Sequence, residues 1–115
     1  MSDMCTSDNP EQLKCALAIL GDRYTALLIR LMHDSPQRFK DFEKAIPEIS
    51  PRTLSQRLTM LEDNGIIEKN TCPDSPGRRQ YELTEAGHDL DAVLHTMAEW
   101  GRKHLNSDAF AKAPA

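Results

Sequence analysis

The chain has 115 residues, of which 39% are hydrophobic and 28% are charged, and its formal net charge is −4. This length predicts a single domain that can bury a core without disulfides or metals. No run approaches the roughly 18 consecutive apolar residues of a membrane helix, and residues 1–10 lack the basic start and apolar core of a signal peptide, so we expect a cytoplasmic protein with no membrane partner.

The acidic total argues against a nucleic-acid partner, but the charge is unevenly distributed. Residues 36–81 carry eight Lys or Arg against seven Asp or Glu, whereas the segments on either side are net acidic. Because only a local basic surface is needed to meet phosphates, the central third remains a candidate interface.

In chain order, we expect a disordered tail over residues 1–8, a folded domain over residues 9–106 and a flexible tail over residues 107–115. A helix is predicted over residues 10–20, with Asn9 as its N-cap and Gly21 ending it. Its apolar face comprises Leu13, Ala16, Leu17 and Leu20.

Asp22 predicts the N-cap of a second helix, over residues 23–33. This helix has a broad apolar band that suits a central position in the core. The band comprises Tyr24, Leu27, Leu28, Leu31 and Met32. Residues 34–36 then break the pattern, and residues 37–39 supply either a short strand or an extended lead into the next helix.

A third helix is predicted over residues 39–46, and Pro47 prevents it from continuing. It buries Phe39, Phe42 and Ile46. A fourth helix follows after a short turn. Two short helices joined in this way, the second one polar on its outer face, are typical of a helix-turn-helix.

The fourth helix carries the clearest functional pattern. Ser50 predicts its N-cap, Pro51 suits the first turn, and Gly65 suits the residue after its end. Leu54, Leu58 and Leu61 form one apolar stripe. The opposite face carries Arg52, Gln56, Thr59, Met60 and Asp63, and the flanks carry Thr53, Ser55 and Arg57. Arg and Gln suit bidentate bonds to guanine and adenine edges, although an ordinary amphipathic surface helix has the same pattern.

Two strands are predicted next, over residues 66–71 and 80–83. The segment between them holds two prolines and a glycine, and it ends in Arg78 and Arg79. We interpret it as the exposed loop of a wing, whose arginines reach a neighbouring phosphate or the minor groove; the alternative is a solubilising loop.

Thr84 predicts the N-cap of the last helix, over residues 85–105. This helix is more apolar than burial against one body requires. Its two apolar rows comprise Leu90, Leu94, Met97 and Leu105, and Val93, Met97 and Trp100. Together with the first helix, it predicts a two-fold dimer.

This order of elements resembles the HxlR-type family of bacterial transcriptional regulators, which are relatives of MarR-type proteins with a winged helix-turn-helix fold. The matching motifs are LGDRYTALLIRL (20–31), RFKDFEKAIPEIS (38–50), RTLSQRLTMLEDNGII (52–67), YELTEAGHDL (81–90) and Trp100-Gly101. The resemblance implies a mainly α fold with a small β-hairpin, dimerisation through the N- and C-terminal helices, no cofactor, and binding to a double-stranded operator of two half-sites.

The resemblance assigns DNA contact to residues of the fourth helix and of the wing. These are Ser50, Arg52, Thr53, Ser55, Gln56, Arg57, Arg78 and Arg79. Arg38 and Lys40 are expected to meet the DNA backbone. Helical geometry agrees for Arg52 and Gln56 but places Arg57 on a flank, where it bonds a phosphate or braces Glu62 and Asp63.

Many members of the family carry a cysteine, often followed by proline, just before the first helix, and in several it senses oxidants or electrophiles. Here Asn9-Pro10 stands at that place. Cys5, Cys15 and Cys72 are the candidate redox residues, and Cys15 adjoins Lys14 in the first helix. No pair of cysteines has zinc-ligand spacing.

Two other classes of function compete with an operator-binding regulator. One is a winged helix that binds proteins, with Met60 and the last helix docking a partner. The other is a regulator that responds to a small molecule or a metal through His33, His88, His95 and His104. No glycine-rich phosphate loop, nucleophile elbow or HExxH motif points to an enzyme.

Overall fold

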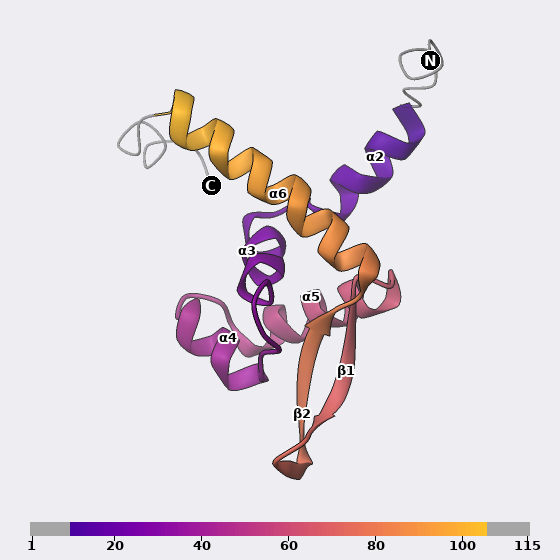
Figure 1. Cartoon of the computed structure of the whole chain (residues 1–115), viewed down its shortest axis with the longest axis vertical. Coiled ribbons are helices and arrows are strands. Elements are labelled where there is room, and N and C mark those ends of the chain that lie inside the picture. The colour runs from indigo at the N-terminus through magenta and orange to yellow at the C-terminus, as the bar shows by residue number, and fades with distance from the viewer. Residues whose placement is uncertain (1–9, 106–115) are drawn as a thin grey trace.

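The computed structural model describes residues 10–105, and the predictions for Cys5, Asn9 and both tails lie outside that range. The elements follow the predicted order: α2 (Pro10–Ile19), α3 (Arg23–Leu31), α4 (Phe39–Ala45), α5 (Pro51–Asp63), β1 (Ile67–Cys72), β2 (Ser75–Leu83) and α6 (Glu85–His104). Figure 1 shows α6 running across the top of the molecule, α2 diverging from it, and the β1–β2 hairpin projecting from the opposite side. The predicted mainly helical fold with one hairpin is confirmed.

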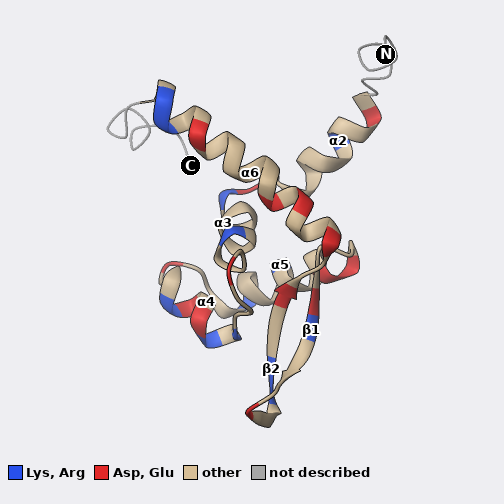
Figure 2. Ribbon diagram, in the orientation of Figure 1, with Lys and Arg blue, Asp and Glu red and all other residues tan. Residues whose placement is uncertain are grey.

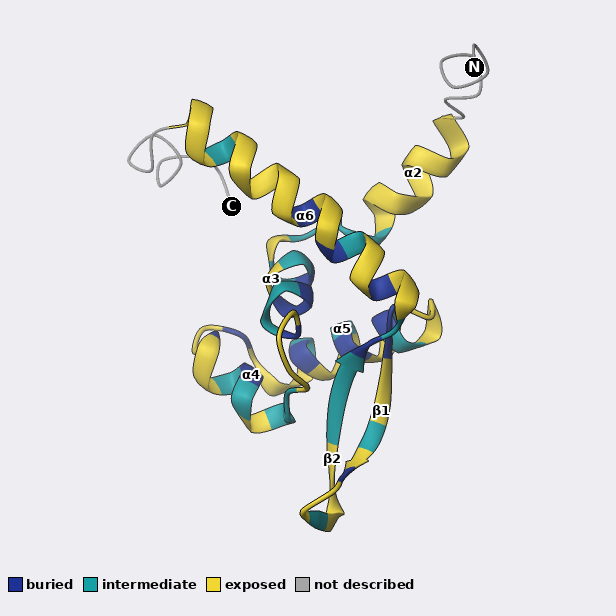
Figure 3. Cartoon of the chain, viewed as in Figure 1, coloured by how far each residue is buried: buried dark blue, intermediate teal, exposed yellow. Residues whose placement is uncertain are grey.

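The core lies between α3, α4, α5 and the bases of the hairpin and α6 (Figure 3). Leu28 and Ile29 of α3 and Phe42 of α4 are fully buried. The predicted stripe of α5 is confirmed, because Leu54, Leu58 and Leu61 are at most 2% exposed. A fully buried side chain of this size contributes about 1.5–3 kcal/mol by leaving water, so this stripe fixes α5 to the core.

One expected placement of an apolar residue is wrong, and a second is right only in part. Leu27 is 45% exposed, because it lies on the side of α3 that faces away from the core, while Ile29 takes the buried position. Met60 lies beside Gln56 and Thr59 on the outer side of α5, as expected, but it is half-buried and also packs against the core.

The helix ends follow local capping rules. The side chains of Asp22, Ser50 and Thr84 accept hydrogen bonds from the backbone N–H groups of Thr25, Thr53 and Gly87, as predicted. Gly65 has a φ of 74°, which is the left-handed conformation expected after a helix.

The hairpin is longer than predicted. β1 and β2 pair antiparallel from Ile67–Leu83 outward to Thr71–Arg79, and a bulge precedes the Cys72–Ser75 pair. Arg78 and Arg79 therefore belong to β2 rather than to the end of a loop. A two-stranded sheet leaves the outer edge of each strand unpaired, so Pro76 and Gly77 are tolerated in β2.

The base of the hairpin is fixed to α6 and to the lead into α4. The Thr84 hydroxyl donates to the carbonyl oxygens of Gly65 and Ile66, at 2.6 and 3.1 Å. Gln37 and Tyr81 exchange two backbone hydrogen bonds, of 2.9 and 2.8 Å, which form an isolated bridge beside β2. The prediction that the chain is extended before α4 is confirmed.

No helix within residues 10–105 is long and apolar enough to cross a membrane.

Candidate nucleic-acid interface

The predicted contact residues of α5 lie on its N-terminal half, away from the core. Arg52, Ser55 and Gln56 are exposed, and Thr53 is half-buried on the flank. Among residues 10–105, Arg52 has no carboxylate within ion-pair distance. Its guanidinium is therefore available to a base edge or a phosphate.

The Ser50 hydroxyl is already engaged within α5. Its Oγ accepts from the Thr53 backbone N–H at 3.0 Å and donates to Thr53 Oγ1 at 3.0 Å. These bonds order the first turn, where Arg52 lies. The structure thus gives Ser50 a structural task at the start of the recognition helix beside its predicted contact to DNA.

The four predicted basic contacts outside α5 come together between α4 and the hairpin. A hollow of about 330 Å³ opens there, lined by Arg38, Phe39, Lys40, Arg78 and Arg79. The Gln37–Tyr81 bridge explains this arrangement, because it aligns the residue before Arg38 with β2, two positions after Arg79. The Tyr81 and Phe42 rings, with centroids 6.1 Å apart, pack behind the bridge.

Among residues 10–105, Asp41 is the one carboxylate that forms an ion pair with a side chain lining this hollow. Asp41 Oδ2 accepts the Arg38 backbone N–H at 2.8 Å and lies 3.9 Å from Arg38 Nε. Figure 2 shows Lys and Arg on α4 and on the hairpin, where Asp and Glu also lie, and further Asp and Glu near the start of α6 and the end of α5. Four basic residues of the central third thus line one hollow, while acidic side chains lie elsewhere on the same elements.

Arg57 has a different environment from Arg52. Its Nε lies 2.5 Å from Asp22 Oδ2 and is shielded from solvent, so charge and proximity hold the pair rather than a well-aligned hydrogen bond. Burial acts to raise the pKa of Asp22, but the Thr25 backbone N–H and the Arg57 charge outweigh it and lower the pKa below its ordinary value. Arg57 does brace a carboxylate, but that carboxylate is Asp22 of the α3 cap and not Glu62 or Asp63.

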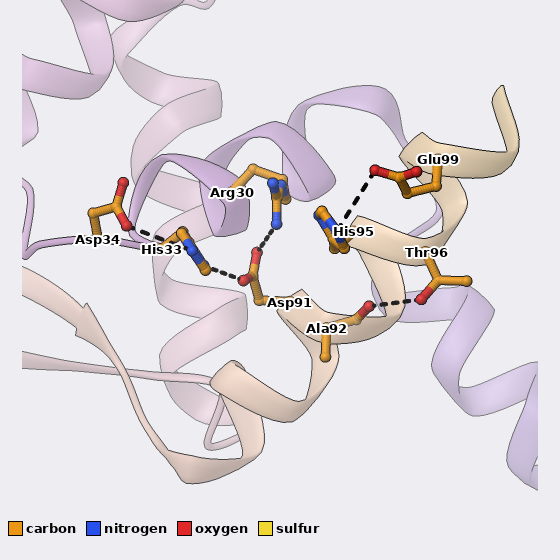
Figure 4. Close-up of polar contacts among 8 residues, drawn as sticks. All are labelled: Arg30, His33, Asp34, Asp91, Ala92, His95, Thr96 and Glu99. Atoms are coloured by element: carbon orange, nitrogen blue, oxygen red, sulfur yellow. Dashed lines mark hydrogen bonds and ion pairs between the residues drawn. The ribbon is translucent and has the colours of Figure 1, made fainter. Parts of the chain in front are cut away.

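A second polar contact, which the sequence patterns did not indicate, joins α3 to α6. Asp91 is 3% exposed, and it accepts from Arg30 Nη1 at 2.8 Å and contacts His33 Nδ1 at 2.5 Å. Figure 4 shows Arg30 and His33 converging on Asp91, while His95 pairs with Glu99 further along α6. In the sequence, the sign of this buried contact is the position of Asp91, an acidic residue inside the apolar row between Leu90 and Leu94.

The described cysteines lie in different surroundings. Cys15 is exposed on α2, and Cys72 is buried near the tip of the hairpin. Within residues 10–105, no three His, Cys, Asp or Glu side chains are grouped as metal ligands would be.

Comparisons with known proteins agree with this geometry. The profile of the family described as HxlR-like helix-turn-helix matches residues 19–109. The chain is 39% identical over 89 residues to the HTH-type transcriptional regulator YodB of Bacillus subtilis, covering 77% of this chain and 80% of that protein. It is 32% identical over 105 residues to the uncharacterised regulator YvaP of the same organism, covering 91% and 93% of the two chains.

Solved structures give the same result. The reduced form of YodB from B. subtilis superposes with a TM-score of 0.73 at 36% identity, covering 84% of this chain and 94% of that one. The reduced form of the redox regulator HypR superposes with a TM-score of 0.76 at 29% identity, covering 89% and 99%. YodB has also been solved bound to quinone and after diamide treatment.

Proposed function

The chain belongs to the HxlR-like helix-turn-helix family of DNA-binding transcriptional regulators, and from this premise we propose that it acts as a homodimer on an operator of two half-sites. The exposed start of α5 carries the proposal. Arg52 and Gln56 read base edges in the major groove, with Thr53 and Ser55 beside them. Acting on the chromosome, the protein works in the cytoplasm.

In this proposal, the basic hollow binds the DNA backbone. Arg38 and Lys40 at the start of α4 and Arg78 and Arg79 on β2 line one concave surface. Phosphate contacts of this kind set the register of a protein on its duplex, while base contacts supply the specificity. The hollow therefore positions α5 rather than selecting the sequence.

The dimer in this proposal forms through α2, the outer half of α6 and Leu27. No residue of α2 is buried, and Leu13, Leu17, Met97 and Trp100 are each more than half exposed. An apolar groove of about 540 Å³ runs between α3 and α6 beside Trp100. In a two-fold dimer, the two α5 helices lie about 34–36 Å apart, or a multiple of that distance, to meet successive major grooves.

Anisotropy titrations test the proposal on two fluorescent duplexes, one selected from a random pool by the protein and one scrambled, at several salt concentrations. We expect a steep salt dependence and a strong preference for the selected duplex. Arg52→Ala should weaken selected binding by about 1–3 kcal/mol and relax the preference at one base pair. Lys44→Ala, which removes the same charge at the exposed end of α4 and outside the basic hollow, is the control. Equal binding of wild-type protein to both duplexes would refute the proposal.

We further propose that thiol oxidation modulates the regulator through Cys15. Its thiol is exposed on α2, the helix proposed for dimerisation, whereas Cys72 is buried. An oxidised thiol there changes a surface that packs against the partner subunit. Mild oxidation should change the affinity of the wild-type protein for the selected duplex and leave Cys15→Ser unchanged. Equal responses of the two proteins would exclude Cys15.

A further inference from the structure

The recognition helix is held against the core in two different ways. Leu54, Leu58 and Leu61 hold it through apolar burial, which is strong but not directional. Among the described residues, one ion pair lies on its flank, between Arg57 and Asp22, and it joins α5 to the residue that caps α3. A directional contact of this kind restricts rotation of α5 about its own axis. The apolar stripe alone restricts that rotation less.

Asp22 is itself rigidly placed. Its Oδ1 accepts from the Thr25 backbone N–H at 2.9 Å and from the Thr25 hydroxyl at 3.2 Å, while Oδ2 faces Arg57. Thr25 is fully buried in the core. The Thr25 contacts thus fix the carboxylate to the body of the protein independently of Arg57. Burial acts to raise the pKa of Asp22, but these contacts and the Arg57 charge lower it below the ordinary value.

Rotation of α5 matters because base readout depends on side-chain direction. Arg52 and Gln56 are exposed on the face beside Arg57, so they turn together with it. Functional side chains must stay within about 10–20° of their productive orientation, and supporting contacts provide that precision.

We propose that Asp22 and Arg57 form a brace that sets the rotation of α5, so that Asp22 is a positioning residue for sequence-specific DNA recognition. This inference rests on the proposed function. Arg57 acts through Arg52 and Gln56 rather than as a contact of its own. Asp22, whose negative charge opposes DNA, is then required for tight specific binding.

The brace and a direct phosphate contact predict opposite results for Asp22. If Arg57 bound a phosphate, Arg57→Gln would weaken binding to every sequence and reduce the salt slope by about 1. Asp22→Asn would then release Arg57 and remove a negative charge, and binding would stay equal or tighten. If the pair is a brace, Asp22→Asn weakens binding to the selected duplex alone.

The experiment uses the two duplexes above with Asp22→Asn, Arg57→Gln and Arg57→Lys. Asn is itself a good N-cap, so Asp22→Asn removes the charge and keeps the cap. Asp89→Asn makes the same charge change at an exposed site on α6 and is the matched control. Circular dichroism and urea unfolding identify the variants that are folded under the binding conditions.

We expect Asp22→Asn and Arg57→Gln each to bind the selected duplex about tenfold more weakly, with scrambled binding and the salt slope unchanged. Arg57→Lys keeps the charge and should recover part of the loss. If Asp22→Asn fails to fold, Arg57→Gln still tests the brace, because loss of a phosphate contact would weaken scrambled binding and lower the salt slope. A selective wild-type protein whose Asp22→Asn variant matches Asp89→Asn would overturn the brace alone. A wild-type protein that binds both duplexes equally would overturn the proposed function, and the brace with it.

Discussion

The helices α3 and α2 each carry several leucines, but their surroundings are opposite. Leu28 and Ile29 of α3 are fully buried, while Leu13 and Leu17 of α2 are 62% and 57% exposed. The body formed by α3, α4, α5, the hairpin and the start of α6 supplies partners for its own apolar side chains. The arm formed by α2 and the outer half of α6 leaves most of its apolar side chains exposed, although Ile19 at the end of α2 packs against the core. Burial in this chain therefore depends on the partners within reach and not on local hydrophobicity.

The helix α6 belongs to both regions, which makes the contrast testable within one element. Gly87, Asp91 and Leu94 are buried against the body, whereas Met97 and Trp100 are exposed. The change occurs in fewer than two turns of helix. Substitutions on either side of it should affect different properties: folding in the first half, and association in the second.

The largest expected effect comes from Gly87→Ala. A Cβ at this position would lie 2.1 Å from the carbonyl oxygen of Ile66, so the start of α6 must shift from the hairpin base. We expect a loss of about 3 kcal/mol or more in the free energy of unfolding, measured with urea. At Gly101, in the arm, the nearest atom would be 3.9 Å away. Gly101→Ala should stabilise the helix by about 0.5–1 kcal/mol, and equal effects of the two variants would contradict the division.

The next largest effect concerns the contact that joins α6 to α3. Arg30→Met leaves Asp91 buried with only His33 as a partner, and we expect a loss of about 2 kcal/mol in urea unfolding. Adding Asp91→Leu removes the unpaired charge and should restore most of the stability. A double variant no more stable than Arg30→Met would show that Asp91 has another role in the fold.

A smaller effect, confined to association, is expected from Trp100→Ala. Trp100 is 58% exposed in one chain, so its removal should change the unfolding of dilute protein little. Because aromatic side chains dominate protein interfaces, we expect about 1–2 kcal/mol weaker dimerisation by sedimentation equilibrium. His88→Ala, exposed on another face of α6, is the control. Unchanged dimerisation of Trp100→Ala would place the interface elsewhere.

What could be predicted from the sequence also differs between local and distant contacts. The caps at Asp22, Ser50 and Thr84 and the buried stripe of α5 depend on residues a few positions apart, and they were predicted correctly. The position of the hairpin strands was misjudged because Pro76 and Gly77 are strand breakers only where a neighbouring strand needs their hydrogen bonds. The contact of Asp91 with Arg30 spans 61 positions: an acidic residue inside an apolar row indicates a buried partner, but only the packed fold identifies Arg30.

The residues of the candidate interface also divide into those placed by local structure and those placed by distant contacts. The outward direction of Arg52 and Gln56 follows from helical periodicity alone. The meeting of Arg38 with Arg79 depends on the Gln37–Tyr81 bridge, and the pairing of Arg57 with Asp22 depends on how α3 crosses α5. Sequence patterns therefore identify the basic residues but not which of them line one hollow and which pairs with a carboxylate at the cap of α3.

The smallest effect concerns the contact between β2 and the lead into α4, where Gln37 pairs with Tyr81, and it is measured as a dependence of stability on pH. Burial raises the pKa of Tyr81, with a further rise from the charge of Glu62 and a partial reduction from Arg79. Because the folded pKa is above the unfolded value of about 10, the stabilisation is complete below that pH and is lost as pH rises through the folded pKa. Tyr81→Phe cannot ionise, so urea unfolding should show it nearly equal to wild type at neutral pH and relatively more stable above about pH 10. Parallel pH profiles for the two proteins would mean that the Tyr81 hydroxyl is as well hydrated in the folded protein as in the unfolded one. The hairpin would then belong with the arm rather than with the body.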